Sequence, residues 1–531
     1  MSPATTKVAH AEPNATTQDW IAVFAGALGA LIATLDISIT NSALPQIQGE
    51  IGATGTEGTW IATGYLVSEV VMIPLTAWLS RMLGMRTLLL TCAVLFTLFS
   101  IMCGASHDLT TMVIGRVGQG FFGGALIPTA QTIVRTRLPP HQIPVGMTMF
   151  GLIVLLGPLM GPVMGGWLTE NSSWQWCFFI NIPVAFGLIS LLLIGVPHQK
   201  ANIHELVEAD WPGIIGMSVG LSCLTIVLEE GQRDQWFDSD VIRWLSVFAV
   251  LGLTTLGITQ FTSKRPVLKL RLLNNRTYAS VIVIIMSVGM VLYDILYVLP
   301  QFLSGVAGYN AFQSGRILAL SGLPAFALMP VLPRILRFGN IKLVVGFGLT
   351  CFAASCFIDI HLTAQSSGTD FVASQLLRGV GQIFSFMPLN QISVGAVSRT
   401  DTADAAGLFN MARNLGGTIG LALLGVFIDR RTEVHADVIR ETVNANSVLV
   451  QDHIAQQGAV FAAQSGDVAL GQQTAIASLA AQIHQQAMVM TFSDCFWILG
   501  VGLLVMSPLL LLLRTPKPVG QPVKQPVLEA H

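Results

Sequence analysis

Four charged residues stand alone inside long apolar stretches, where they could hold or move a proton. Asp36, Glu69 and Asp294 are each surrounded by apolar residues, and Arg116 lies inside the apolar stretch 109–134. A charge at that depth in a bilayer costs several kcal/mol unless it is paired or faces water. Isolated charges of this kind typically mark proton relays or solute paths.

The predicted depths of these residues favour an ion pair between Asp36 and Arg116. At about 1.5 Å per helical residue, Asp36 lies about 16 residues into its stretch, and Arg116 about 7 residues into a stretch of opposite direction. Asp294 and Arg378 have corresponding positions in later stretches, so all four are expected roughly 10–15 Å below one membrane face. Glu69 is expected slightly deeper.

Two proton-coupling schemes are compatible with this pattern. A carboxylate paired with Arg116 stays ionised, whereas a buried Glu69 without a nearby cation is easier to protonate. We therefore hypothesise that Glu69 or Asp294 takes the coupling proton and that Asp36 and Arg116 form a structural and switching pair. In the competing scheme Asp36 is protonated during the cycle and releases Arg116. A hydrogen-bonded core role is the structural alternative for each acid.

Four further residues are candidates for the lining of a substrate cavity: Tyr65, Gln119, Asn410 and Arg413. Arg413 is a cation inside an apolar stretch, and we expect it to face a central cavity. For Tyr65 the alternative is a place in the packed core.

The stretch 144–168 has a pattern of small residues and prolines. Gly157, Gly161 and Gly165 are four apart, which places them along one helix face for close packing. Pro158 and Pro162 each remove a backbone hydrogen bond and favour a kink. The pattern predicts close helix packing, and a gating role for the kinked helix is compatible with it.

A short basic turn, with Arg81, Gly84 and Arg86, separates two apolar stretches. It either anchors the topology or clamps neighbouring helix ends in one conformational state, since a cation is favourable at a helix C-terminus.

The composition identifies a polytopic membrane protein. The 531 residues are 52% hydrophobic and 11% charged, whereas soluble domains carry about 25% charged residues. The net charge of −2 gives no sign of nucleic-acid binding. We find no phosphate-binding loop motif, no zinc motif and no nucleophile–base pair, so we expect no metal, no cofactor and no enzymatic activity. The seven cysteines lack metal-ligand spacing and do not predict a disulfide framework.

The hydropathy pattern predicts an all-α protein with about fourteen transmembrane helices, since about 20 apolar residues cross a bilayer. The predicted spans are 20–44, 58–79, 87–105, 109–134, 144–168, 177–196, 211–228, 241–262, 277–299, 315–333, 342–362, 370–397, 404–428 and 487–513.

Basic residues gather in alternate loops, which by the positive-inside rule places both termini in the cytoplasm. The polar start of the chain lacks the features of a cleavable signal peptide, so we expect the first span to direct insertion. The segment 429–486 is then on the opposite side. Its apolar residues recur at helical spacing, which predicts one or two amphipathic helices that form either a solvated cap or a docking surface for a partner.

Two six-span halves of equal length flank two extra spans, which indicates an internal repeat. The motif 116–120 of the fourth span is echoed by 378–382 in the twelfth, and the basic turn 79–86 by 334–342. The predicted organisation is a tail 1–19, a six-helix bundle 20–196, two linker helices within 197–276, five helices of a second bundle 277–428, the loop 429–486, the last helix 487–513 and a tail 514–531.

Several motifs together resemble those of the fourteen-span drug:proton antiporters of the major facilitator superfamily, in particular the EmrB-like branch. These motifs occupy 35–45, 74–86, 116–120, 151–167 and 174–183. Ala77 and Ser80 depart from the pattern, standing where many relatives have Gly and Asp.

The resemblance implies two six-helix bundles plus two extra spans, and proton-coupled export of lipophilic or amphipathic compounds across a bacterial inner membrane. It also implies a periplasmic adaptor and an outer-membrane channel as possible partners. Two alternatives are a dedicated exporter of a natural product, such as a siderophore or fatty acid, and a membrane sensor or scaffold that moves no solute.

Overall fold

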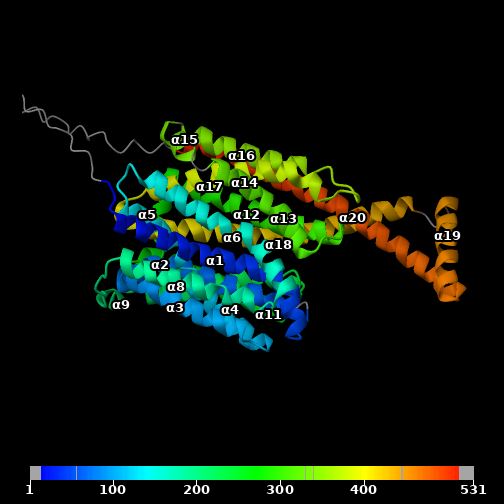
Figure 1. The fold of residues 1–531 in the computed structure, drawn as a ribbon, viewed down its shortest axis with the longest axis horizontal. Coiled ribbons are helices and arrows are strands. Elements are labelled where there is room, and N and C mark those ends of the chain that lie inside the picture. Colours follow the sequence, from blue (N-terminus) through cyan, green and yellow to red (C-terminus); the bar gives the residue numbers. More distant parts are fainter. Residues whose placement is uncertain (1–13, 55–56, 329–330, 339, 444–446, 514–531) are drawn as a thin grey trace, which may run out of the picture.

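The computed structural model describes residues 14–54, 57–328, 331–338, 340–443 and 447–513, and these residues form helices that run side by side (Figure 1). Most of the predicted tail 1–19 and all of the tail 514–531 lie outside the described residues. We call the end where α1 begins and η7 ends the termini end, and the other the opposite end.

The first bundle contains α1 (Thr17–Glu50), η1 (Glu57–Thr59), α2 (Trp60–Leu83), α3 (Met85–Gly104), α4 (Leu109–Gly123), α5 (Leu126–Arg137), α6 (Ile143–Asn171), α7 (Trp176–Phe179) and α8 (Asn181–Gly195). The linker contains α9 (His204–Val207), α10 (Trp211–Glu230), η2 (Trp236–Asp238), α11 (Asp240–Thr262) and η3 (Leu270–Asn274).

The second bundle contains α12 (Arg276–Gly305), α13 (Ala311–Ala319), η4 (Leu320–Gly322), α14 (Leu323–Leu328), α15 (Leu332–Phe338), α16 (Ile341–Ile358), η5 (Gly368–Phe371), α17 (Val372–Gly395), η6 (Arg399–Asp401), α18 (Thr402–Thr442), α19 (Val448–Ser465), α20 (Val468–Met506) and η7 (Ser507–Leu512).

Eleven helices of the described chain are long and apolar enough to span a membrane, and they coincide with eleven of the predicted spans. The other three predictions also fall on helices. The span 109–134 is divided between α4 and α5, the span 315–333 overlaps α13, η4 and α14, and the span 370–397 coincides with α17, in which Arg378 and several amides interrupt the apolar residues. The predicted all-α membrane fold is therefore confirmed.

Local sequence signals explain several helix starts. Thr16 and Asp19 form a capping box at the start of α1, and Asn310 and Gln313 do the same for α13. Asp108 caps α4, and its hydrogen bonds from Thr111 hold the pKa of its carboxyl below the usual range. These caps satisfy backbone N–H groups that the first helical turn leaves free.

The segment 429–486, for which the sequence predicts one or two amphipathic helices, is mostly helical in the described residues. α18 continues without a break to Thr442, and α20 begins at Val468 and continues to Met506. Figure 1 shows α19 and the adjoining parts of α18 and α20 projecting beyond the bundles at the opposite end. Hydropathy marks where a chain leaves the membrane, whereas the helix continues because the following Ala, Gln and Glu residues also favour it.

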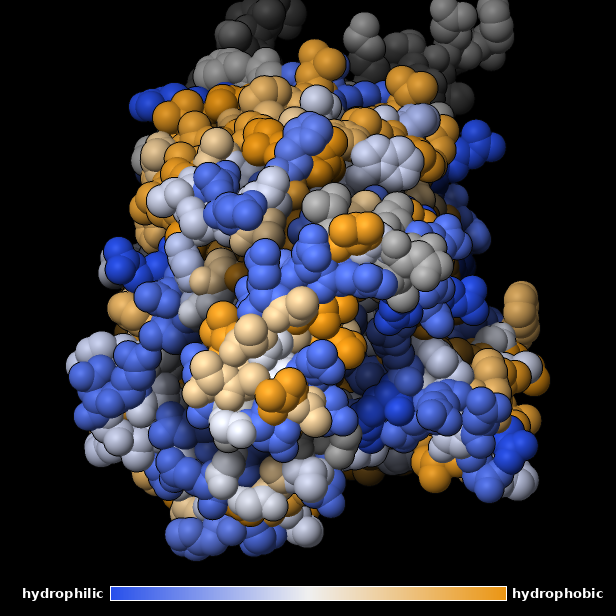
Figure 2. Space-filling view, turned by 90° about the vertical axis from the view of Figure 1, so that its right-hand side faces the viewer, coloured by the Kyte–Doolittle hydropathy of each residue, from blue (hydrophilic) through white to orange (hydrophobic). Residues whose placement is uncertain are grey.

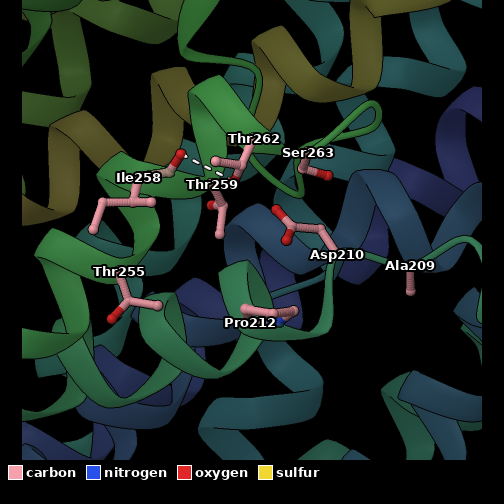
Figure 3. Close-up of a pocket in the computed structure, with 8 residues that line it drawn as sticks. All are labelled: Ala209, Asp210, Pro212, Thr255, Ile258, Thr259, Thr262 and Ser263. Carbon is pink, nitrogen blue, oxygen red and sulfur yellow. Dashed lines mark hydrogen bonds between the residues drawn. The ribbon is translucent and has the colours of Figure 1, made fainter.

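The extra helices lie on one side of the bundles, where α10 packs against α2, α11 and α18. A hollow of about 410 Å³ lies between α10 and α11 near the termini end (Figure 3). Its lining includes Asp210, Thr255 and Thr259, and Asp210 already caps α10 by accepting from Gly213. The hollow contains none of the candidate functional residues.

Candidate functional site

Asp36 and Arg116 meet in the interior of the first bundle. Arg116 Nη1 lies 2.5 Å from Asp36 Oδ2, and both side chains are at most 1% exposed. Gln119 Nε2 and Asn181 Nδ2 donate to Asp36 Oδ1 at 2.9 and 2.7 Å. Because α1, α4 and α8 each contribute a member, the carboxylate is fixed in position by three helices.

Further contacts extend this network, although Asn181 Oδ1 has no hydrogen-bond partner among the described residues. Arg116 donates through Nε to the Ile61 carbonyl at 3.1 Å, and its guanidinium lies 4.4 Å from the centre of the Tyr65 ring. Gln119 and Asn181 both donate to the Ser100 hydroxyl, at 3.0 and 2.8 Å. The structure thus places Tyr65 and Gln119, our candidates for a cavity lining, in a fully buried network.

Glu69 lies where α2 of the first bundle packs against α18 of the second. Its side chain is 1% exposed, and its Oε2 atom has no hydrogen-bond partner among the described residues. Arg413 and Asn414 of α18 face this carboxylate, Asn414 with its hydrogen-bonding amide, and Arg116 of the first bundle acts on it electrostatically. The sequence showed no cation near Glu69, because Arg413 reaches it only through the packing of the two bundles.

Arg413 is half-buried next to this carboxylate and does not pair with it closely. It donates to the neighbouring Asn414 Oδ1 at 3.2 Å through Nη2, and lies 5.6 Å from the centre of the Phe386 ring. Tyr293 of α12 also donates to Asn414 Oδ1, at 3.3 Å. Asn410, one turn earlier, is fully buried and donates to Gln131 of α5 at 2.9 Å, so it joins the two bundles.

Asp294, the repeat counterpart of Asp36, is in a different environment. It is 2% exposed, its Oδ1 atom has no hydrogen-bond partner in the described chain, and it packs against Gly420 of α18. Arg378, the counterpart of Arg116, instead pairs with Asp359, the residue that follows α16, at 2.7 Å. The two halves of the chain therefore have an arginine at the corresponding position, but its acidic partner does not stand at corresponding positions in the two halves.

The glycine pattern of α6 packs against α1. A methyl group at Gly157, Gly161 or Gly165 would overlap Thr34, Ser38 or Ser42 of α1 respectively. Pro158 and Pro162 lie inside α6, and a methyl at Gly315 of α13 would approach Pro162 to 2.7 Å. This helix therefore contacts both bundles.

Arg81 of the basic turn reaches across to the second bundle. Its Nη1 atom lies 3.1 Å from Asp404 in the first turn of α18, and Lys269 Nζ lies 2.9 Å from the same carboxylate. Gly84 has φ +80° between α2 and α3, where a Cβ would also lie 2.9 Å from Gln199. Arg86 is half-buried in the first turn of α3.

The ion pairs of Arg81 and Lys269 with Asp401 and Asp404, which we call the clasp, stabilise the charged forms of Lys269 and Asp401. Burial opposes the charge of Lys269, but its hydrogen bonds to Asp401 and Asp404 outweigh that effect and raise its pKa above the usual value. Hydrogen bonds from Lys269 and Ser398 lower the pKa of Asp401. Arg135 donates to the Val397 carbonyl at 3.0 Å nearby, so several contacts close the termini end.

Sequence reasoning assigned no functional role to Asn181, Ser100, Asp359 or Asp404. The first two are uncharged and their spacing gave no signal, whereas Asp404 could have been found as an acid at a helix start. Sequence reasoning also assigned no functional role to Glu229, which directly follows the predicted span 211–228. The described residues contain no group of three or more His, Cys, Asp or Glu side chains that could hold a metal ion.

Comparison with known proteins places this geometry in context. Residues 26–421 match the model of the Major Facilitator Superfamily. The chain is 30% identical to the colistin resistance protein EmrB of Acinetobacter baumannii, over 91% of this chain and 94% of that protein. It is 29% identical to the multidrug export protein EmrB of Escherichia coli, over 94% and 96%. It is 30% identical to the fatty acid resistance protein FarB of Neisseria gonorrhoeae, also over 94% and 96%.

Solved structures show the same fold. The human organic anion transporter MFSD10 aligns with a TM-score of 0.59 at 14% identity, covering 93% of this chain and 99% of that one. The proton:xylose symporter XylE aligns with a TM-score of 0.57 at 12% identity, covering 93% and 95%.

Proposed function

This chain belongs to the Major Facilitator Superfamily, and from that premise we propose that it exports lipophilic or amphipathic compounds in exchange for protons. It is a multi-pass membrane transporter related to EmrB-type exporters, and not an enzyme. The observation that most supports proton coupling is Glu69, a buried carboxylate with an unpartnered oxygen where the two bundles meet. A proton on Glu69 removes a charge that burial disfavours. Because Glu69 lies between α2 and α18, protonation would then affect how closely the two bundles pack.

Glu69 and Asp294 are better proton carriers than Asp36 in this scheme. Every oxygen of Asp36 accepts a hydrogen bond from a cation or an amide, so neither oxygen is free to take a proton without the loss of a contact. Glu69 and Asp294 each keep one buried oxygen without a partner. The competing scheme, in which Asp36 is protonated and releases Arg116, changes contacts among the three helices α1, α4 and α8.

The proposed mechanism is alternating access. Contacts of Arg81 and Arg135 with the second bundle close the termini end in this structure. Protonation at Glu69 from the opposite side would accompany substrate release, and proton loss towards the cytoplasm would accompany the next substrate. One inward charge is worth about 2.3 kcal/mol per 100 mV of membrane potential, which can support a useful outward substrate gradient.

We place both termini in the cytoplasm and the protein in a bacterial inner membrane. The basic loops and the bacterial relatives support this orientation and location. The helical extension formed by 429–486 then lies in the periplasm. Val434, Val438 and Val448 are each about half or more exposed there, and Figure 2 shows apolar side chains among hydrophilic ones at this end. Such a surface suits a periplasmic adaptor, and through it an outer-membrane channel.

The substrates of the relatives set the range of compounds to test. The relatives are named for multidrug export, colistin resistance and fatty acid resistance, all of which concern amphipathic or lipophilic compounds. A dedicated exporter of one natural product, such as a siderophore or fatty acid, is the alternative. Its cavity would favour one compound, whereas a multidrug exporter would accept chemically diverse ones.

Vesicle assays test this function. Inverted membrane vesicles with and without the chain would be given a pH gradient, and lipophilic cations and fatty acids would be added while a dye reports the gradient. We expect several compounds to dissipate the gradient only when the chain is present. One active compound would favour the dedicated exporter, and none would favour a sensor or scaffold that moves no solute.

A further inference from the structure

The end of α10 joins both bundles at the opposite end of the molecule. Its two last residues, Glu229 and Glu230, are adjacent and therefore point in different directions on the helix. Glu230 faces α2 of the first bundle and Glu229 faces α18 of the second. An extra helix thus brings two acids to the line along which the bundles meet.

Both carboxylate oxygens of Glu230 have partners, and these contacts join α10 to α2. Glu230 is 2% exposed and lies 2.5 Å from Arg233. Thr63 of α2 donates to it at 2.8 Å, and Arg233 donates to the Thr59 hydroxyl at 2.6 Å. These contacts fix α10 on the first bundle and leave Glu230 paired.

Glu229 has different surroundings. Its Oε1 atom is buried and has no hydrogen-bond partner among the described residues, and no cation pairs with it there. Thr418 is the polar residue of α18 that faces its carboxylate, and Glu230 is the other charged group near it. A buried carboxylate oxygen that accepts no hydrogen bond does not help to fix the helix in position, so a chemical role is the better explanation for this acid.

A hollow lies beside the ion pair of Glu230 and Arg233. It has a volume of about 290 Å³ and is lined by Glu57, Trp60, Arg233 and Asp234. Arg233 belongs to both the hollow and the ion pair with Glu230. Water in the hollow can therefore contact Arg233, which pairs with Glu230 at the end of α10.

Polar groups continue from Glu229 towards Glu69. Thr418 lies one turn beyond Asn414 on α18 and donates to its carbonyl at 3.2 Å. Tyr293 donates to the Asn414 side chain and interacts electrostatically with both Glu229 and Glu69. Hydroxyl groups both donate and accept hydrogen bonds, so Thr418 and Tyr293 would pass a proton on after turning away from Asn414.

We propose that Glu229 is a proton relay between the aqueous hollow at the opposite end and Glu69. A proton from the aqueous phase binds a Glu229 carboxylate oxygen and forms an O–H bond. That bond breaks when the Glu69 carboxylate takes up a proton, and Glu229 returns to its ionised form. This proposal rests on the proposed function, and it gives α10 a part in coupling.

Transport assays with purified protein in liposomes distinguish a proton-relay role of Glu229 from a purely structural one. Two activities are measured with tetraphenylphosphonium and, separately, laurate: proton flux induced by the probe under a pH gradient, and exchange of labelled for unlabelled probe at equal pH. We expect Glu229→Gln to slow proton flux roughly tenfold or more and to leave exchange within about twofold, because exchange needs no net proton transfer. Glu229→Asp, which keeps an acid, should restore part of the flux.

Asp240→Asn is the matched control, since it removes an exposed acid near the same end of the molecule. It should change neither activity. Normal proton flux in Glu229→Gln, or an equal loss of flux and exchange, would overturn the relay. If wild-type protein moved no protons with either probe, the proposed function itself would fail, and the relay with it.

Discussion

Arg81 and Asp404 join the two bundles across the termini end, with Nη1 and Oδ2 3.1 Å apart. The arginine comes from the last turn of α2 and the acid from the first turn of α18, so the contact exists only while these helix ends stay together. Its geometry makes the basic turn a clasp between bundles.

Loss of this clasp should change the conformational equilibrium more than the stability. A partly exposed ion pair contributes about 1 kcal/mol or less, so Arg81→Ala should shift the ratio of two conformations up to about fivefold. Labelling of a cysteine introduced at the termini end would report the shift. Asp404→Asn, which removes the acid that both Arg81 and Lys269 contact, should shift the equilibrium in the same direction, and equal labelling of all variants would contradict a clasp.

The buried network around Asp36 predicts a large loss of stability on neutralisation. Asp36→Asn leaves Arg116 buried without its ionic partner, which should lower the free energy of unfolding by about 3–5 kcal/mol. Asp294→Asn removes no ion pair and should cost less than about 1 kcal/mol. Thermal unfolding in detergent compares the two, and the reverse order would show that this description of the acids is wrong.

Close packing between α6 and α1 predicts that Gly161 cannot carry a side chain. A methyl group there would overlap Ser38, so Gly161→Ala should destabilise by about 1–3 kcal/mol and slow transport. Gly187 of α8 is the matched control, because nothing lies within 4 Å of a methyl added to it. Gly187→Ala should be neutral or stabilise by about 0.5–1 kcal/mol. Unfolding temperatures that fell equally in both variants would contradict the packing argument.

The Lys269–Asp401 contact should not act as a pH switch near neutrality. The lowered pKa of Asp401 gives stability that is present above its unfolded value and is lost only as pH falls through the folded value. The raised pKa of Lys269 gives stability that is lost only as pH rises through its folded value, at strongly alkaline pH. Lys269→Gln should therefore leave the pH profile of transport between pH 6 and 8 unchanged. A profile that moved with this variant would place a coupling group in the clasp.

Sequence periodicity and depth were sufficient to predict the helices and one buried ion pair. Asp36 and Arg116 stand at matching depths in antiparallel spans, so their pairing followed from helix geometry alone. The same reasoning did not predict that Arg378 pairs with Asp359, because nothing in the sequence states which of several buried acids a helix will face. Arg413 opposite Glu69 depends on how two bundles pack, which hydropathy does not encode.

Helix ends were predicted less well than helix centres. The hydropathy signal placed the last spans at 404–428 and 487–513, whereas α18 and α20 continue far beyond the apolar residues. It also ended a span at 228, immediately before Glu229 and Glu230. Polar residues at a span end look like solvated loop in the sequence, and only the packing of α10 against α2 and α18 reveals that these acids are buried.

Substrate-induced proton release from purified protein tests the central claim most directly. Wild-type protein in weakly buffered detergent would receive lipophilic cations and fatty acids while a dye reports pH, with Glu69→Gln, Asp36→Asn and Asp294→Asn measured beside it. We predict release from wild type and its loss in Glu69→Gln, with binding of the compound retained. Undiminished release from Glu69→Gln together with loss in Asp36→Asn would contradict this account and favour protonation of the Asp36–Arg116 pair.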